Sequence, residues 1–187
     1  AFEGKYYRGI ASSYKLNLNE DIKLVTNMWF SQTFRSGNID VNNKITSIDI
    51  TGLFRSESEL SRKNNILENT FGGEIAFTTA NTQIHTCIYY LKYDKEAISQ
   101  SSSVIKGKDG LWWSVAMTHT EKYWNSAIEF SIDKNNLVGF QGNFLVKDKK
   151  IEMGLQSRYF HQSFISPTGW HFGEFSNPSN EIGIYTG

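Results

Sequence analysis

The chain has 187 residues, a length within reach of one domain, and we predict a single domain over residues 1–187. Lys and Arg together number 19, as do Asp and Glu, so the net charge is zero and there is no basic field for non-specific binding of nucleic acid. Cysteine occurs once, at Cys87, which excludes an intrachain disulfide framework and a cysteine-based metal site.

Hydropathy excludes one class of membrane protein and leaves another open. No run of about 18 apolar residues occurs, which excludes a transmembrane helix. The mean hydropathy of −0.42 is ordinary for a soluble protein, but a membrane β-barrel has a similar mean because its strands alternate lipid-facing and lumen-facing residues. The N-terminus has no signal-peptide pattern, and residues 182–187 begin a strand-like pattern that breaks off, so we expect a portion of a longer protein.

Residues 21–35 show the clearest period-two alternation, which is the signature of a β-strand. This segment is far longer than the average strand of about 5–6 residues, whereas a tilted transmembrane strand needs about 9–11 residues within the hydrocarbon layer. Val25 and Trp29 are exceptions to the alternation. The apolar face carries Ile22, Leu24, Met28, Phe30 and Phe34, and the polar face carries Lys23, Asn27, Ser31, Thr33 and Arg35.

The same alternation recurs along the chain and predicts a series of antiparallel hairpins. The predicted strands are residues 5–16, 21–35, 67–79, 83–93, 111–120, 123–133, 137–146 and 151–159, with the start of a ninth at 182. Short turns are predicted at 17–20, 80–82, 121–122, 135–136 and 147–149, and long connections at 36–66, 95–110 and 160–181. Short turns at one end and long loops at the other are typical of outer-membrane barrels.

Aromatic residues gather where the predicted strands end, as they do in the interfacial girdles of membrane barrels. A soluble sandwich that buries aromatic residues in mid-strand accounts less naturally for this distribution. The residues are Tyr6, Tyr7, Phe34, Tyr93, Trp112, Trp113, Tyr123, Trp124, Tyr159 and Phe160.

Helical signals interrupt the β pattern in residues 51–77, which carry the densest charge in the sequence. Ser56 and Glu59 have the spacing of a capping box and predict a short helix over residues 56–63, with Arg62 and Lys63 near its end to complement the helix dipole. A well-capped helix in a long loop is the simpler interpretation. The alternative is an interaction motif at the mouth or in the lumen of a barrel. Its candidate residues are Arg55, Glu57, Glu59 and Arg62.

Charged residues on the polar faces of the strands are predicted to line the lumen of a barrel, where opposite signs can pair across strands. Two interpretations stay open here, a plugged interior held by ion pairs and a polar conduit. The lumen-facing candidates are Lys23, Arg35, Glu68, Glu74, Glu129, Glu152 and Arg158.

We predict no enzymatic activity, metal or cofactor. A glycosidase uses two acids, as Glu57 and Glu59 would, but beside Arg55 and Arg62 these acids are more simply a salt-bridged helix surface. The histidines lack metal-ligand spacing such as HxxxH, and no GxSxG elbow occurs. The glycines at 72–73 and 107–110 do not open a helix after a strand, as phosphate-binding loops do.

Several blocks resemble one family. Residues 52–73, with LFRSESELSRKN followed by FGGEIAF, resemble a block in a family of Bacteroidota outer-membrane proteins in which a helix-hairpin-helix segment of the DNA-uptake type often precedes a large β-barrel. Residues 4–13 (GKYYRGIASS), 159–161 (YFH) and 174–187 (EFSNPSNEIGIYTG) resemble blocks at corresponding places. The resemblance implies a mid-barrel portion of a larger protein and no catalytic residue. Nothing in these residues supports handling of DNA.

We therefore predict an all-β fold, an antiparallel meander of about 8–9 long strands that forms a transmembrane β-barrel, or part of a larger one, in the outer membrane. The predicted function is a transport, secretion or assembly component. Its expected partners are membrane lipid or lipopolysaccharide, and other outer-membrane chains or the missing part of the same chain. The alternative is a soluble extracellular β-sandwich that binds carbohydrate through exposed aromatic residues such as Trp112, Trp113 and Trp170.

Overall fold

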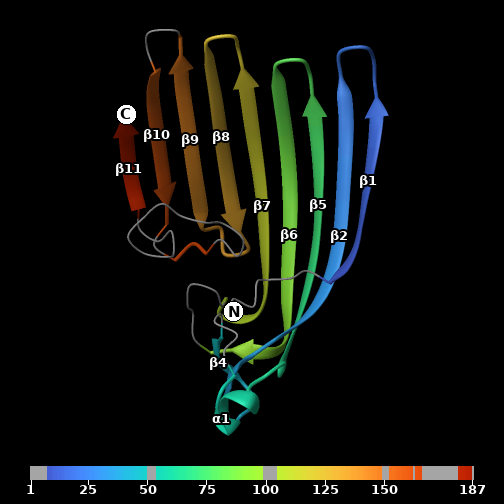
Figure 1. The fold of residues 1–187 in the computed structure, drawn as a ribbon, viewed down its shortest axis with the longest axis vertical. Helices are drawn as coiled ribbons and strands as arrows, with labels where there is room; N and C mark the ends of the chain where they lie inside the picture. Colours follow the sequence, from blue (N-terminus) through green and yellow to red (C-terminus); the bar gives the residue numbers. More distant parts are fainter. Residues whose placement is uncertain are drawn as a thin grey trace.

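The long strands form one antiparallel sheet in which neighbours in space are also neighbours in the chain (Figure 1). The computed structural model describes residues 8–49, 54–98, 105–148, 152–161, 163–165 and 181–186. The strands are β1 (Gly9–Asn17), β2 (Lys23–Arg35), β5 (Ile66–Thr78), β6 (Thr82–Ala97), β7 (Gly107–Thr120), β8 (Trp124–Asp133), β9 (Val138–Lys147), β10 (Glu152–Phe160) and β11 (Glu181–Thr186). Their order across the sheet is β1-β2-β5-β6-β7-β8-β9-β10-β11.

This order confirms the predicted all-β antiparallel meander. The sheet is open, because among the described residues β1 and β11 each pair with a single neighbour. Closure into a barrel therefore stays a prediction.

Connections alternate between the two ends of the sheet. Figure 1 places the β1–β2, β5–β6, β7–β8 and β9–β10 connections together at the upper end, where all are short. The lower end holds the longer β2–β5, β6–β7 and β10–β11 connections, and one short turn between β8 and β9. In that turn Asn136 has a φ of 60°, a left-handed conformation that asparagine tolerates. The carboxylate of Asp133 accepts the backbone N–H groups of Asn135 and Leu137, at 2.8 and 2.9 Å.

The β2–β5 connection contains structure that the sequence did not predict. A small hairpin of β3 (Gly37–Ile39) and β4 (Ile45–Ile48) lies below the main sheet, and Ile45 of β4 pairs in parallel with Ala97 of β6. Strands of three and four residues are too short for a period-two pattern to be distinguished from chance.

The predicted helix is present but short. Helix α1 spans Glu57–Leu60, and its capping box is as expected: Ser56 Oγ accepts the Glu59 N–H at 3.3 Å, and the Glu59 carboxylate accepts the Ser56 N–H at 3.1 Å. The predicted end at residue 63 is wrong, because Arg62 and Lys63 lie beyond the helix and its last turn has no basic residue. The guanidinium of Arg62 instead donates to Asn38 Oδ1 of β3 at 2.9 Å.

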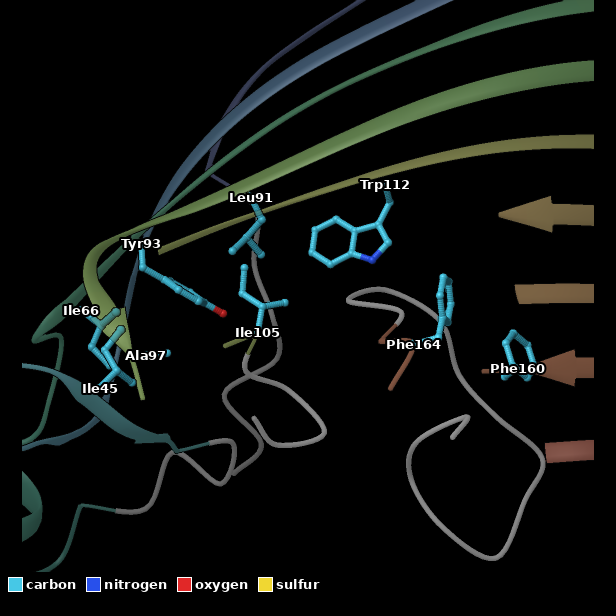
Figure 2. Packing of buried hydrophobic residues seen from close by; sticks show 9 residues of the cluster. All are labelled: Ile45, Ile66, Leu91, Tyr93, Ala97, Ile105, Trp112, Phe160 and Phe164. Carbon is cyan, nitrogen blue, oxygen red and sulfur yellow. The ribbon is translucent and has the colours of Figure 1, made fainter. Parts of the chain in front are cut away.

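The buried apolar cluster lies at the lower end, on one face of the sheet (Figure 2). Its members come from strands and from connections alike: Ile45, Ile66, Leu91, Tyr93, Ala97, Ile105, Trp112, Phe160 and Phe164. Figure 2 shows Ile105 and Phe164, from the β6–β7 and β10–β11 connections, beneath the strands. The described parts of these two connections therefore lie under the sheet and pack against it.

Candidate functional site

Pleating gives the sheet two faces of opposite character. Side chains on a strand alternate between faces, and the pairing registers carry each face across the sheet. We call the face with Glu74, Cys87 and Ser114 the inner face, and the face with Ile75 and Ile88 the outer face.

The outer face is apolar. Every large hydrophobic side chain that is exposed in strands β1, β2 and β5–β10 points to it. These residues are Ile10, Tyr14, Leu16, Met28, Phe34, Phe71, Ile75, Phe77, Ile84, Ile88, Leu111, Trp113, Trp124, Ile128, Phe130, Phe140, Phe144, Met153, Leu155 and Tyr159.

A polar row ends this apolar surface on its lower side. Gln32, Asn69, Lys92 and Asp109 are in register across four neighbouring strands, and Gln32 Nε2 donates to Asn69 Oδ1 at 2.9 Å. We call these four residues the border row. Below it the outer face of β6 is polar, whereas Phe34 of β2 and Leu67 of β5 still point outward.

Strand β6 shows the change of polarity on a single element. Above the border row, Ile84 and Ile88 point outward, and below it the outward side chains of β6 are those of Asp94 and Glu96. The inner face changes in the opposite sense, from half-buried His85 and Cys87 to buried residues that begin at Leu91, one position above the row. Those buried residues of β6 are Leu91, Tyr93 and Ala97.

The predicted aromatic girdles are only partly present. Phe34, Trp113, Trp124 and Tyr159 point outward and are exposed. The prediction is wrong for Tyr93, Trp112 and Phe160, which point inward and belong to the apolar cluster because the folded-back connections cover them. Tyr123 lies in the β7–β8 turn, and Tyr6 and Tyr7 lie outside the described residues.

The seven charged residues predicted from the polar faces all lie on the inner face. Half-buried Arg35 and buried Glu68 form an ion pair at 3.0 Å, and Glu152 pairs with Lys147 at an exposed site, at 3.1 Å. Glu74 lies 2.7 Å from His85 Nδ1 and accepts Asn27 Nδ2 at 3.0 Å. Whether this face is the lumen of a barrel stays a prediction. The other three candidates are Lys23, Glu129 and Arg158, the last of them buried.

The inner face contains a hollow of about 710 Å³. Side chains from β2, β5, β6, β7 and β8 form its floor, the start of β1 bounds one side, and Phe164 from the β10–β11 connection bounds another. Of the seven charged candidates, Glu74 and Glu129 line it. Arg35 and Glu68 lie lower on the same face.

A row of aromatic residues crosses this floor. Trp29, Gly72, Tyr89 and Trp112 are in register on β2, β5, β6 and β7, and the rings of Tyr89 and Trp112 are 5.8 Å apart. A Cβ atom on Gly72 would come within 1.9 Å of the Trp29 ring, so the missing side chain lets the indole lie against the strand. Sequence reasoning missed this row. Its only signal was Trp29, a bulky residue at a position where the alternation calls for a polar one.

The loop-helix candidates do not form an ion-pair network. Within the described residues, no ion pair within 4.0 Å joins Arg55, Glu57, Glu59 and Arg62, so the predicted salt-bridged helix surface is wrong. The Glu59 carboxylate accepts the backbone N–H groups of Arg55 and Ser56, and these bonds hold the pKa of Glu59 below its ordinary value. None of the four residues lines the hollow. Their role as an interaction motif stays a prediction.

Two further searches of the described part of the chain found nothing. No group of three or more His, Cys, Asp or Glu side chains there is placed to hold a metal ion. None of the helices there has the length and apolar character needed to cross a membrane. Comparisons of the chain with protein-family models, with curated proteins and with solved structures gave no match.

Proposed function

We propose that this chain forms part of the wall of an outer-membrane β-barrel that acts as a transport, secretion or assembly component without enzymatic activity. The observation that carries this proposal is the change of polarity at the border row. A water-soluble protein buries its apolar residues inward along the whole length of a strand, whereas β6 does so only from Leu91 downward. Above that point its apolar side chains face outward, as they must in lipid.

The size of the apolar surface supports the proposal. On β6 it runs over residues 84–90, which is roughly 20–23 Å along the strand at about 3.3 Å per residue. At the usual tilt of about 35–45° this length covers about 14–19 Å of the apolar band of about 25 Å on membrane barrels. Its exposed apolar area is on the order of 1,500 Å² from the size of such side chains. The largest patch on a typical soluble monomer is about 300–600 Å².

The direction of the strands bears on how such a barrel closes. Because all pairings in the main sheet are antiparallel and the order is sequential, β1 and β11, the first and the ninth strand in that order, run in the same direction. Pairing β1 with β11 directly would create a parallel seam, whether within one chain or between copies in a ring. Barrels of bacterial outer membranes have an even number of antiparallel strands.

We therefore propose that an odd number of further strands completes the wall. Among the described residues, no strand pairs with the outer edges of β1 and β11, and lipid does not tolerate unpaired backbone groups. The strands come from the rest of the same polypeptide or from another outer-membrane chain, and lipid or lipopolysaccharide covers the outer face. The resemblance to the Bacteroidota outer-membrane family is in line with a mid-barrel portion of this kind.

The alternative, a soluble sandwich with a carbohydrate-binding aromatic surface, has weaker support. Trp112 and Trp113 are consecutive strand residues on opposite faces, and Trp112 is buried, so they do not form one platform. Trp170 lies outside the described residues. A second sheet over the outer face would also have to stop at the border row.

Membrane fractionation tests the proposal. The complete protein should stay with the membrane through a carbonate wash and need detergent for release, since the outer face is apolar. A matched soluble periplasmic protein serves as the control for trapping in vesicles. Release of the protein into detergent-free buffer would refute the proposal and favour the soluble sandwich.

A further inference from the structure

The outer face contains a groove of about 560 Å³ over β2, β5 and β6, above the border row. At its centre is Gly73, which is in register with Met28 on β2 and Ile88 on β6. A Cβ atom on Gly73 would have no neighbour closer than 3.6 Å, so the space between the two larger side chains is open. The volume lies within the roughly 300–1,000 Å³ of ligand pockets.

An aromatic row connects this gap to the border row. Phe30, Phe71 and Tyr90 line the groove in register on the same three strands, and the centroids of neighbouring rings are 4.7 and 6.3 Å apart. The rings lie two residues below the level of Gly73 and two residues above Asn69 of the border row, on the same face. The distance from Gly73 to Asn69 is thus about 13 Å along β5, at about 3.3 Å per residue. One elongated apolar chain can therefore lie along the strands from the gap to the border row.

Two cations on the outer face have no partner of opposite charge. Lys92 and Arg8 are exposed, and neither forms an ion pair within 4.0 Å among the described residues. Arg8 precedes β1 and continues the level of the border row, because its carbonyl accepts the Gln32 N–H at 2.9 Å and the next pair along is Gly9 with Ser31. By the alternation of side chains, Arg8 falls on the outer face.

The carboxylates that adjoin Lys92 on this face are already neutralised. Asp109, in register with Lys92, lies 3.2 Å from Lys134 Nζ. Asp94, two residues below on β6, pairs with Lys95. The unpaired charge at this level is therefore positive and suits a phosphate group, which lysine and arginine bind through charge-assisted hydrogen bonds.

The spacing of the two cations favours a phosphorylated sugar over a single phosphate. Arg8 and Lys92 are separated by three strand spacings, about 14 Å at about 4.8 Å each. Gln32 and Asn69 lie between them, and their mutual hydrogen bond leaves the Gln32 carbonyl oxygen and an Asn69 N–H for sugar hydroxyls. A disaccharide with a phosphate at each end meets one cation at each end. A single phosphate would require both side chains to converge across the amides.

The position along the strands agrees with this choice. The border row is near the lower end of the sheet, which holds the longer connections (Figure 1). In outer-membrane barrels the longer loops are extracellular. On the proposed function, the border row therefore lies at the leaflet in which lipopolysaccharide is the main lipid.

We propose that the groove binds the lipid A part of lipopolysaccharide, an acylated disaccharide that carries phosphate groups. One acyl chain fills the gap at Gly73 and lies over the aromatic row, and the phosphates meet Lys92 and Arg8. The place of this site at the outer leaflet rests on the proposed function. The binding itself depends only on the groove and the two cations.

A matched pair of lipids tests the role of the phosphates. Lipid A with two phosphates and the same lipid A after removal of both have identical acyl chains. Each is titrated in mixed micelles into the complete protein, purified free of lipid in detergent, and binding is measured by thermophoresis. The phosphorylated form should bind at least about tenfold more tightly. Equal affinities, or equally tight binding of phosphatidylglycerol, would overturn the proposal.

Charge variants locate the phosphates. Lys92→Gln and Arg8→Gln each remove one exposed cation and should each weaken binding of lipid A roughly three- to tenfold. Lys122→Gln is the control, because it removes the same charge from the short turn between β7 and β8, at the opposite end of the sheet. If Lys122→Gln had the same effect as Lys92→Gln, the attraction would be a property of overall charge and the site would be excluded.

A second variant locates the acyl chain. Gly73→Leu fills the gap and should weaken binding of both forms of lipid A, whereas Ser126→Leu adds the same side chain on the outer face of β8, outside the groove, and should not. Circular dichroism verifies that each variant is folded. Unchanged affinity in a folded Gly73→Leu variant would exclude the groove. Self-association of the protein that Gly73→Leu abolishes, with no preference for phosphorylated lipid, would assign the groove to a second copy of the chain and overturn the proposal.

This proposal and the proposed function fail in different ways. A protein that needs detergent for release but does not distinguish the two forms of lipid A keeps the barrel and loses the lipid site. A protein that is released into buffer yet binds lipid A through Lys92 and Arg8 keeps the site and loses the barrel.

Discussion

Substitution of Ile88 by arginine tests the assignment of the outer face most directly. Ile88 is near the middle of the apolar surface of β6, in register with Gly73 on β5 and Trp113 on β7, and is 48% exposed. The nearest residue of the border row on its own strand, Lys92, is four positions away, which is about 13 Å along the strand. On the outer face of its own strand, an arginine at position 88 has only the hydroxyls of Thr86 and Tyr90 nearer than Lys92, and Thr86 already accepts the Trp113 indole N–H.

The expected cost depends on what covers the outer face. In lipid, an arginine at mid-depth of a barrel costs about 2–4 kcal/mol, and the same residue near the interface costs about 0–1 kcal/mol. If water covered the face, an exposed isoleucine-to-arginine change would alter the free energy of unfolding by no more than about 0.5 kcal/mol. Gln32→Arg in the border row is the matched control, because it adds the same side chain on the same face at the predicted edge of the membrane.

Urea-induced unfolding of the complete protein in phospholipid vesicles provides the measurement. We expect Ile88→Arg to lower the unfolding free energy by about 2–4 kcal/mol and Gln32→Arg by less than about 1 kcal/mol. Equal effects of the two substitutions would refute the assignment of the border row as the edge of the membrane. A stable Ile88→Arg variant would refute lipid contact altogether.

Four further predictions concern the inner face and the loop helix. Gly72→Ala should destabilise the protein by about 1–3 kcal/mol and change the tryptophan fluorescence, because its Cβ would meet the Trp29 ring. Gly73→Ala should be tolerated, because its Cβ would have no neighbour closer than 3.6 Å. Equal stabilities of the two variants in urea titrations would contradict this prediction. Trp112→Phe removes the N–H that the Ile165 carbonyl accepts and should speed hydrogen exchange of the Phe164 amide. Trp113→Phe is the control, because it loses a hydrogen bond to Thr86 on the outer face and should leave that exchange unchanged. Ser56→Ala should weaken α1 by about 1 kcal/mol, as judged by proteolysis within residues 54–63. The pKa of Glu59 is lowered in the folded protein, so the contribution of Glu59 to the cap is present above the ordinary pKa of 4.5 and is lost as the pH falls through the folded pKa. Proteolysis of residues 54–63 should therefore rise only in that acid range. A rise near neutral pH would exclude Glu59 as the cause.

Much of the fold follows from local pattern in the sequence. Period-two alternation located every long strand, and the capping-box spacing of Ser56 and Glu59 located α1, because both depend on neighbours a few residues away. The sequence also predicted that the seven charged residues share one face, because side chains alternate between the two faces along each strand. The β3–β4 hairpin did not, because its strands are too short to show a period.

Features that depend on distant contacts were not predictable. Tyr93, Trp112 and Phe160 were assigned to aromatic girdles, since the sequence does not say that the β6–β7 and β10–β11 connections fold back and cover them. The hollow likewise depends on a register across five strands and on Phe164 from a distant connection. Whether the wall closes is a property of strands outside the sheet, and no pattern within one strand contains it.

The edge of the apolar surface is an intermediate case, since its signal is present in the sequence but is not a simple alternation. In β6 the apolar residues occupy even positions at Ile84, Ile88 and Tyr90 and odd positions at Leu91, Tyr93 and Ala97, so the alternation changes phase between Tyr90 and Leu91. In a soluble strand such a phase change would place apolar side chains in water on one side of it. In a strand that leaves the membrane, the same change turns the apolar side chains from lipid to a protein core at the point where the lipid ends. On the proposed function, a phase change without an inserted residue is the expected sign of a membrane boundary, whereas a β-bulge would produce the same change by adding one residue to the strand. The pairing of β6 with β5 and β7 is continuous through Tyr90, Leu91 and Lys92, without a bulge, and this continuity favours the membrane boundary.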